Sequence, residues 1–283
     1  MPPKRIDSLG RITEPLAVHL WENSWEPKFV DFTTLETLSN KKVCFVCHFF
    51  LGDTICALSA TREYARKHPD QDVYFEGLDS VVEAFGDGLV KAGCPEGSEV
   101  IHFKIDDRFY VKDKSPYFNL AGCFLSLLGI IPTSPPKPEL PEVPCLASLK
   151  PQGYIAVQPW AYTSRNPPEK IMQIIVDKCN QHFKLPIIVV GKMSKTRRFL
   201  IDVKYDYLSN DIISMLSIIK HAKCVITAWS AASHIAAAYN IPMILPPIET
   251  TQPPGTDNFW LSDYPLAFTS INKFFDCTNQ RIT

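Results

Sequence analysis

The fold of this chain is decided first by Val43-Cys44-Phe45-Val46-Cys47-His48 and by the turn Leu51-Gly52-Asp53-Thr54 that follows it. The apolar run has the length and composition of a buried strand. Apolar residues then recur with helical spacing, so residues 54–67 predict a helix that ends near His68-Pro69. A buried strand, a glycine turn and a helix form the opening of a β-α-β unit, in which the strands pair in parallel.

The same alternation of strand and helix continues along the rest of the chain. In the first half, the pattern predicts strands at 72–75 and 99–103 and helices at 81–92 and 118–128. The second half repeats it, with strands at 154–158, 186–190, 223–227 and 241–245 and helices at 167–181, 211–221 and 231–239. Short strands separated by helices predict parallel sheets with helices on both faces, which is the α/β class.

A proline-rich segment separates the two halves. It runs from Pro132 to Pro144, and so many prolines cannot continue a helix or a central strand. We therefore expect two Rossmann-like lobes whose parallel sheets face each other across a cleft, where ligands bind beyond the carboxyl ends of the strands. The predicted parts are an N-terminal extension packed on the first lobe (1–40), an N-lobe (41–131), a proline-rich linker (132–150) and a C-lobe (151–283).

The composition is typical of a soluble globular protein, with 46% hydrophobic and 21% charged residues. A net charge of -1 gives no general attraction to polyanions, although a local basic groove is compatible with that total. The first residues, Met1-Pro2-Pro3-Lys4-Arg5, contain no apolar signal core, and no apolar run has the length of a membrane span. We expect a cytoplasmic protein without a membrane span.

The nine cysteines are scattered, mostly in apolar runs. Cys44 and Cys47 form a CxxC, but within one predicted strand their side chains point to opposite faces. No second CxxC follows at zinc spacing, so the pattern favours buried structural thiols over a metal or redox pair. No DxD motif stands at a predicted strand end, and the sequence therefore predicts no metal site.

Three motifs fall at the ends of predicted strands. The first is the Gly52-Asp53 turn, and the second is Ala156-Val157-Gln158-Pro159-Trp160 with the loop Ser164-Arg165-Asn166-Pro167-Pro168 after it. The third is Trp229-Ser230-Ala231-Ala232-Ser233-His234-Ile235-Ala236-Ala237-Ala238, which leads to Ile241-Pro242. In this order and spacing, over about residues 41–255, they resemble the ADP-heptose:lipopolysaccharide heptosyltransferase family, glycosyltransferase family nine. The resemblance implies a GT-B fold and transfer of a sugar from a nucleotide diphosphate sugar.

Asp53 is the catalytic base that the resemblance implies. The reaction needs a base to remove the proton of the acceptor hydroxyl as that oxygen attacks the anomeric carbon. A carboxylate at a strand–helix turn faces the predicted cleft and is suited to this task. The same position is also typical of a helix N-cap aspartate, and both interpretations stay open.

The resemblance places the donor diphosphate beside a loop that carries a cation. Arg165 stands where the family has a lysine, and Ser164 and Thr163 add hydroxyl donors. Arginine can bind a diphosphate bidentately, while the alternative is a solvated loop arginine. Lys192 is a second cation at a predicted strand end, and Gln158, which ends the strand before the loop, is also assigned to donor binding.

Ser230 and His234 begin the helix whose N-terminus, in the family, holds the donor phosphates and ribose. They are four residues apart and therefore share one helix face. For His234 the alternative is a packed, hydrogen-bonded core histidine.

The sequence departs from the family pattern on the donor side. Trp229 stands where the family has an aspartate, so an aromatic face replaces a carboxylate and ADP-heptose cannot be assumed as the donor. Trp229 is assigned to donor binding because it can stack on a base or a sugar. Glu249 and Thr250, at the next strand end, offer replacement polar contacts to the sugar, unless this loop only turns the chain.

These expectations combine into an inverting, metal-independent glycosyltransferase that needs no cofactor besides its donor. The expected acceptor is a hydroxyl of a saccharide or lipopolysaccharide, or of a modified nucleobase in DNA. Two other functions stay open: a non-catalytic nucleotide-sugar-binding protein on the same scaffold, which Trp229 favours, and a nucleotide-dependent epimerase. The sequence does not indicate the oligomeric state.

Overall fold

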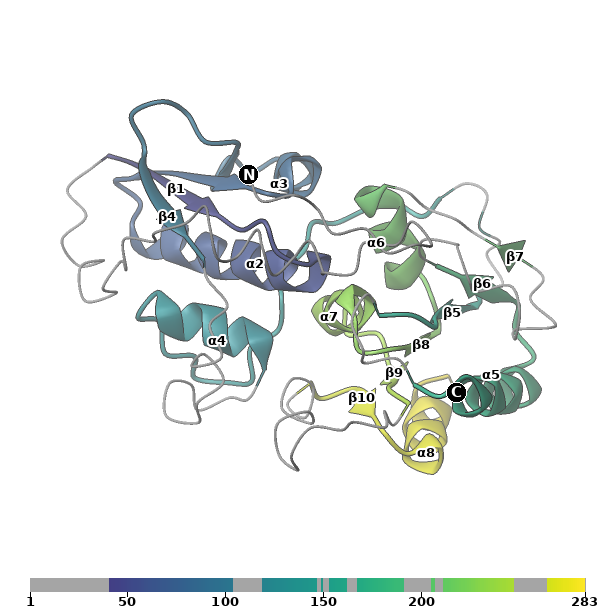
Figure 1. Ribbon diagram of the computed structural model, residues 1–283. Helices are drawn as coiled ribbons and strands as arrows, with labels where there is room; N and C mark the ends of the chain where they lie inside the picture. Colours follow the sequence, from purple (N-terminus) through teal and green to yellow (C-terminus); the bar gives the residue numbers. More distant parts are fainter. Residues whose placement is uncertain are drawn as a thin grey trace, which may run out of the picture. The chain divides into compact units, whose positions relative to one another are not determined.

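The structure of the protein is a computed structural model, and it describes residues 41–103, 119–146, 149, 153–161, 167–190, 205–206, 211–246 and 264–282 (Figure 1). The predicted N-terminal extension at 1–40 lies outside these residues. Two separate parallel sheets are present, one built from strands before the proline-rich segment and one from strands after it. We call these the N-lobe sheet and the C-lobe sheet. The predicted α/β class is confirmed.

The N-lobe sheet has four parallel strands in the order β3-β2-β1-β4. The elements of this lobe are β1 (Lys42–Val46), α2 (Leu51–Lys67), β2 (Asp72–Glu76), α3 (Asp79–Phe85), β3 (Lys91–Ala92), β4 (Glu99–His102) and α4 (Leu120–Leu127). The fully buried ring of Phe45 in β1 has its centroid 4.9 Å from that of Tyr64 in α2 and 5.6 Å from that of Phe103. Phe103 packs edge-on against Phe124 of α4. These rings join α2 and α4 to one face of the sheet (Figure 1).

The C-lobe sheet has six parallel strands in the order β10-β9-β8-β5-β6-β7. The elements of this lobe are β5 (Ile155–Gln158), α5 (Glu169–Phe183), β6 (Ile187–Val189), β7 (Tyr205–Asp206), α6 (Ile212–Lys220), β8 (Cys224–Thr227), α7 (Ala231–Ala238), β9 (Met243–Ile244), β10 (Ala267–Phe268) and α8 (Ile271–Ile282). Strands β5, β6 and β8 pack with α5 and with Phe274 of α8 in one hydrophobic core. The central strands are continuous apolar runs because helices cover both faces of such a sheet.

Each sheet has a point at which the direction of strand addition reverses. In the N-lobe the chain adds β2 and β3 on one side of β1 and then returns to add β4 on the other side. In the C-lobe it adds β6 and β7 on one side of β5 and then adds β8, β9 and β10 on the other. Ligands of open α/β sheets bind beyond the carboxyl ends of the strands at such switch points. The fold therefore favours a site after β1 in one lobe and after β5 and β8 in the other.

Most predicted elements are present with shifted bounds, but the prediction of a single helix over 81–92 is wrong. Helix α3 ends at Phe85, and Lys91–Ala92 form strand β3. Gly86 caps α3 with a φ of 64°, and Gly88 follows with a φ of 66°. Glycines in the left-handed region end a helix, and they leave the chain free to return to the sheet. Among the helices that the structure describes, none is both long enough and apolar enough to cross a membrane.

The proline-rich segment is attached to helices of both lobes. The Glu139 carboxylate lies 3.2 Å from the Arg62 guanidinium and 2.6 Å from that of Arg66, both in α2. Two residues further along, the Pro141 carbonyl accepts a 2.7 Å hydrogen bond from the hydroxyl of Tyr239, which follows α7. Side chains of both lobes therefore hold the proline-rich segment in place.

Candidate active site

Asp53 lies in the first turn of α2, after the carboxyl end of β1. The helix begins at Leu51 and not at the predicted Thr54, and Phe50 occupies the N-cap position without a side-chain hydrogen bond. Asp53 is thus the third residue of the helix, where the helix dipole stabilises a carboxylate. The N-cap alternative is therefore wrong, whereas the role of catalytic base stays a prediction.

Two buried thiols flank Asp53. Burial raises the pKa of Cys47 to about 12, and it raises the pKa of Cys56 well above its ordinary value; the charge of Asp53 adds to both effects. The Cys47 sulfur lies 3.9 Å from the Thr54 hydroxyl oxygen, on the α2 side of the sheet. Both thiols therefore stay protonated at neutral pH and are poor nucleophiles.

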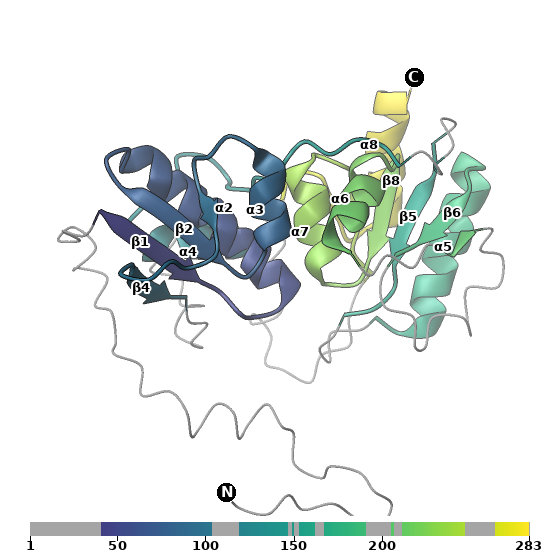
Figure 2. The same ribbon diagram turned by 90° about the horizontal axis from the view of Figure 1, so that it is seen from above.

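Gly52 allows α2 to approach α7 closely (Figures 1 and 2). A Cβ atom at Gly52 would lie 2.8 Å from Cδ2 of His234 and 3.5 Å from Cα of Ala231, the first residue of α7. The first of these contacts is too short for a real Cβ atom, so only glycine fits without a shift of the histidine. Gly52, the residue next to Asp53, thus touches the first turns of α7, the helix that is predicted to hold the donor.

His234 is buried against α2. Only 8% of the residue is exposed, and its Nδ1 atom lies 2.9 Å from the Tyr264 hydroxyl and 3.6 Å from the Cys56 sulfur. Burial lowers the pKa of His234 to about 4, so the ring is neutral at pH 7. This geometry is that of the packed, hydrogen-bonded histidine that the sequence left open. Donor binding by His234 stays a prediction.

We expect the free energy of unfolding to fall as the pH decreases from 6.5 to about 4, because of His234. In this range the unfolded chain binds a proton at His234 and the folded protein does not, so protons favour unfolding. The loss reaches about 3 kcal/mol at the acid end. Urea denaturation at a series of pH values measures it.

A variant of His234 isolates this effect. His234→Gln is expected to flatten the dependence of the free energy of unfolding on pH between pH 6.5 and 4. A wild-type stability that is constant over this range contradicts the neutral burial of His234.

Gln158 joins the ends of β5 and β8 at the C-lobe switch point. Its Oε1 atom accepts a 2.6 Å hydrogen bond from the Ser230 hydroxyl and a 3.2 Å bond from the backbone N–H of Ala232. Ser230 is the N-cap residue of α7, but its own side chain does not cap the helix. Gln158 therefore satisfies one of the amides that a helix N-terminus otherwise offers to an anion. A donor phosphate at this amide would have to displace the Gln158 side chain.

Trp229 follows β8, immediately before Ser230. Its Nε1 atom is buried, and no hydrogen-bond partner is found for it within the part of the chain that the structure describes. A buried N–H without an acceptor costs about 1–3 kcal/mol. An acceptor oxygen of a bound ligand would remove this cost, so the position of Trp229 suits a donor-binding residue.

The two-sheet arrangement is similar to solved glycosyltransferase structures. The iron-containing dodecameric glycosyltransferase TibC from enterotoxigenic E. coli H10407 aligns over 86% of this chain and 77% of its own, with a TM-score of 0.59 and 10% identity. A family-nine glycosyltransferase from Veillonella parvula DSM 2008 aligns over 85% and 89%, with a TM-score of 0.57 and 10% identity. The ADP-heptose lipopolysaccharide heptosyltransferase II of E. coli aligns over 85% and 96%, with a TM-score of 0.56 and 12% identity.

The chain has the GT-B fold. The resemblance to glycosyltransferase family nine is thereby confirmed at the level of the fold, since several of these structures are members of that family or heptosyltransferases. No protein-family model and no curated protein matches the sequence.

Five of the predicted donor-binding residues lie outside the described residues. They are Ser164, Arg165, Lys192, Glu249 and Thr250. The predicted donor-binding residues that the structure describes are Gln158, Trp229, Ser230 and His234. The cation that is expected to meet the diphosphate stays a prediction.

Sequence reasoning did not identify Cys56 and Tyr264 as neighbours of the predicted site. Cys56 follows Asp53 by one helical turn, so helical spacing was a signal that could have placed the two on one face. Tyr264 reaches His234 from a segment that precedes β10, and nothing in the local sequence indicates that contact. Only the tertiary structure brings it there.

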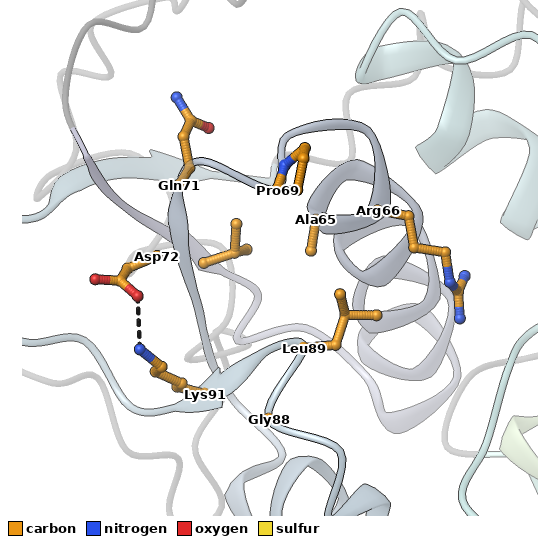
Figure 3. Close-up of a pocket in the computed structure, with 9 residues that line it drawn as sticks. Ala65, Arg66, Pro69, Gln71, Asp72, Gly88, Leu89 and Lys91 are labelled. Atoms are coloured by element: carbon orange, nitrogen blue, oxygen red, sulfur yellow. Dashed lines mark hydrogen bonds and ion pairs between the residues drawn. The ribbon is translucent and has the colours of Figure 1, made fainter.

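A depression of about 440 Å³ lies at the opposite edge of the GT-B N-lobe (Figure 3). Its lining comes from the end of α2 and the starts of β2 and β3, and it consists of Ala65, Arg66, Pro69, Gln71, Asp72, Val73, Gly88, Leu89 and Lys91. Asp72 and Lys91 form an exposed ion pair of 2.6 Å there. Because this is the amino edge of the strands, it is not where an open α/β sheet binds its ligand.

Proposed function

We propose that this protein transfers a sugar from a nucleotide diphosphate sugar to an acceptor hydroxyl, with inversion and without a catalytic metal ion. Asp53 removes the proton of the attacking hydroxyl. The segments after β5 and β8 hold the donor, with Trp229 and Ser230 among the contacts, and Ser164 and Arg165 bind the diphosphate.

One observation carries this proposal: the first turn of α2, which contains Gly52 and Asp53, meets the start of α7. Each stands at the switch point of its own sheet, and Gly52 lies against His234 and Ala231. A base on one lobe and a helix N-terminus on the other are the two parts that an inverting transfer needs side by side. The GT-B fold supports the same function, because the similar solved structures are glycosyltransferases.

A saccharide is favoured over nucleic acid as the acceptor. Three N-lobe cations are each paired with a carboxylate: Arg62 with Asp87, Arg66 with Glu139 and Lys91 with Asp72. Paired cations give a weaker attraction to a phosphate backbone than a free basic groove does.

A second candidate is a nucleotide-sugar-binding protein without transfer activity. The hydrogen bond from the Ala232 amide to Gln158 favours it, because an internal side chain occupies a group that a donor phosphate would use. The two candidates share a donor site and differ in turnover.

The experiment is a thermal-shift screen with ADP, UDP, GDP and their sugar derivatives, with the monophosphates as controls. A ligand present at 100 times its Kd stabilises the folded protein by about 2.7 kcal/mol. For a chain of this size that corresponds to a rise in Tm of about 5–10 °C. We expect one diphosphate to give such a rise and its monophosphate to give much less, and ADP is tested first because one similar structure is an ADP-heptose enzyme.

Turnover then separates the two candidates. Release of the nucleoside diphosphate in the presence of a saccharide acceptor supports the transferase, and binding without release over a broad acceptor panel supports the binding protein. No shift with any nucleotide or nucleotide sugar contradicts both.

A further inference from the structure

Three side chains of the kinds that bind transition metals converge on the N-lobe sheet, away from Asp53. They are Cys44 of β1, Glu76 at the end of β2 and Cys94, two residues after β3. One ligand atom from each lies within 4.8 Å of the other two. We call this group the Cys44–Glu76–Cys94 cluster.

The sheet itself explains why these three side chains meet. Cys44 pairs with Tyr74 in the parallel register of β1 and β2, and Glu76 is two residues beyond Tyr74, so Cys44 and Glu76 share one face. Strand β3 lies on the other side of β2. At its end Gly93 has a φ of 84°, and its carbonyl accepts a 3.7 Å hydrogen bond from the Cys44 thiol. The chain thus turns back across β2, which brings Cys94 to Cys44.

We propose that the Cys44–Glu76–Cys94 cluster binds one divalent transition-metal ion, and that zinc is the ion its ligands fit best. Two thiolates and one carboxylate are a soft-to-borderline set, which selects zinc over magnesium or calcium. The fourth coordination position of the zinc ion is filled by water or by one further side chain.

The spacing of the cluster is close to that of a bound site. With zinc–sulfur bonds of 2.3 Å and zinc–oxygen bonds of about 2.0–2.2 Å, tetrahedral ligand atoms lie about 3.5–3.8 Å apart. In the structure the distances between ligand atoms have an upper limit of 4.8 Å, which is about 1 Å longer than in a zinc site. Side-chain rotations can close a difference of this size.

The ligand types of the cluster suit a divalent cation. The Glu76 carboxylate lies beside two thiols, and a bound divalent cation balances the charge of the thiolates that form when both thiols release their protons to solvent.

His48 supports the carboxylate ligand from outside the cluster. Its Nε2 atom lies 3.1 Å from Oε1 of Glu76, and its side chain is 61% exposed. Hydrogen-bonded partners of metal ligands fix ligand orientation, and their loss costs 10- to 100-fold in metal affinity. His48 is therefore a positioning residue for Glu76.

The cluster lies on the opposite side of β1 from the α2 contact. The Cys47 thiol contacts Thr54 of α2, whereas the Cys44 thiol contacts Gly93. The two cysteine side chains therefore point to opposite faces of the sheet, as the sequence predicts. The Cys47 N–H donates a 3.1 Å hydrogen bond to the Glu76 carbonyl. A metal ion at Glu76 would therefore also steady the chain that leads from β1 to Asp53.

The test measures metal on protein that has been stripped with a chelator under reducing conditions, reloaded with zinc chloride and desalted. We expect about one zinc per chain in the wild type, by elemental mass spectrometry. Cys94→Ser is expected to lose it, and the exposed Cys145→Ser, outside the cluster, is expected to keep it. His48→Gln is expected to raise the Kd for zinc 10- to 100-fold.

Cobalt provides a second readout, because cobalt bound to thiolate absorbs strongly in the near ultraviolet. We expect this band in the wild type and in Cys145→Ser, and not in Cys94→Ser. If Cys94→Ser fails to fold, His48→Gln still tests the site because the exposed His48 supports no core packing. The proposal is overturned if the wild type binds no zinc, if Cys94→Ser binds as much as the wild type, or if freshly isolated protein contains a Cys44–Cys94 disulfide instead.

Discussion

Asp53→Asn is expected to lower the rate constant for sugar transfer by about 10²- to 10⁴-fold, the usual contribution of a general base. Asparagine keeps the size and the position in the first turn of α2, and it removes the basic oxygen. The Kd for the donor is expected to stay within a few-fold of the wild-type value, because the proposed donor-binding residues lie on the C-lobe. Initial rates of nucleoside diphosphate release, with the donor that the thermal-shift screen identifies, measure the effect.

Asp79→Asn is the matched control for this variant. Asp79 also lies in the first turn of an N-lobe helix, α3, and it is exposed. Both substitutions remove one negative charge at a helix N-terminus, so both carry the same small loss of dipole stabilisation. If the two variants lose activity equally, or if Asp53→Asn keeps the wild-type rate, Asp53 is not the base.

Gly77→Ala is expected to destabilise the protein by about 3 kcal/mol, from backbone strain and overpacking together. Gly77 has a φ of 139°, which side-chain-bearing residues rarely adopt. A Cβ atom there would lie 2.4 Å from the Cys47 carbonyl oxygen and 3.1 Å from Cγ2 of Thr54. The obstacle is backbone, so a side-chain rotation cannot relieve it. Denaturant titration gives the loss in free energy of unfolding.

Gly86→Ala separates the two causes. Gly86 also has a positive φ, 64°, but nothing lies within 4 Å of a Cβ atom built there. Its cost is that of a left-handed alanine alone, about 1–2 kcal/mol. If Gly77→Ala and Gly86→Ala lose the same free energy of unfolding, the short contact with the Cys47 carbonyl does not destabilise Gly77→Ala. Because Gly77 also abuts Thr54 beside Asp53, we expect Gly77→Ala to lower activity as well.

Local signals predicted the elements where the physical cause is local. The apolar run at Val43–Val46, the glycine turn and the helical spacing after it require no distant contact, and β1 and α2 are found there. The prediction fails at 81–92, where apolar spacing outweighed the two glycines that end α3. Helix α2 begins at Leu51, three residues before the predicted start at Thr54. Glycine and aspartate are common in turns, which favours the later start, whereas packing on α7 keeps Gly52 and Asp53 helical.

The candidate site also has features that local sequence predicts and features that depend on distant contacts. Asp53, Gln158, Trp229 and Ser230 are predicted from the sequence because residues after parallel strands share one edge of a sheet, and their roles stay predictions. The inward direction of His234 and the capping of α7 by Gln158 were not predictable, because both depend on contacts between segments far apart in the sequence. Glu76 directly follows the strand predicted at 72–75, so the strand-end rule could have selected it. Its approach to Cys44 and Cys94 depends on the order of strands.

The sequence alone determined the α/β class, the two repeats of strand and helix, and the place of a Gly-Asp pair after the first strand. Periodicity, glycine and proline encode these features within a few residues of chain. The tertiary structure alone decided the strand orders, and with them the two switch points that bring Gly52 against His234 and Cys94 back to Cys44. Strand order depends on which buried surfaces pair across the whole chain, and no local pattern carries that information.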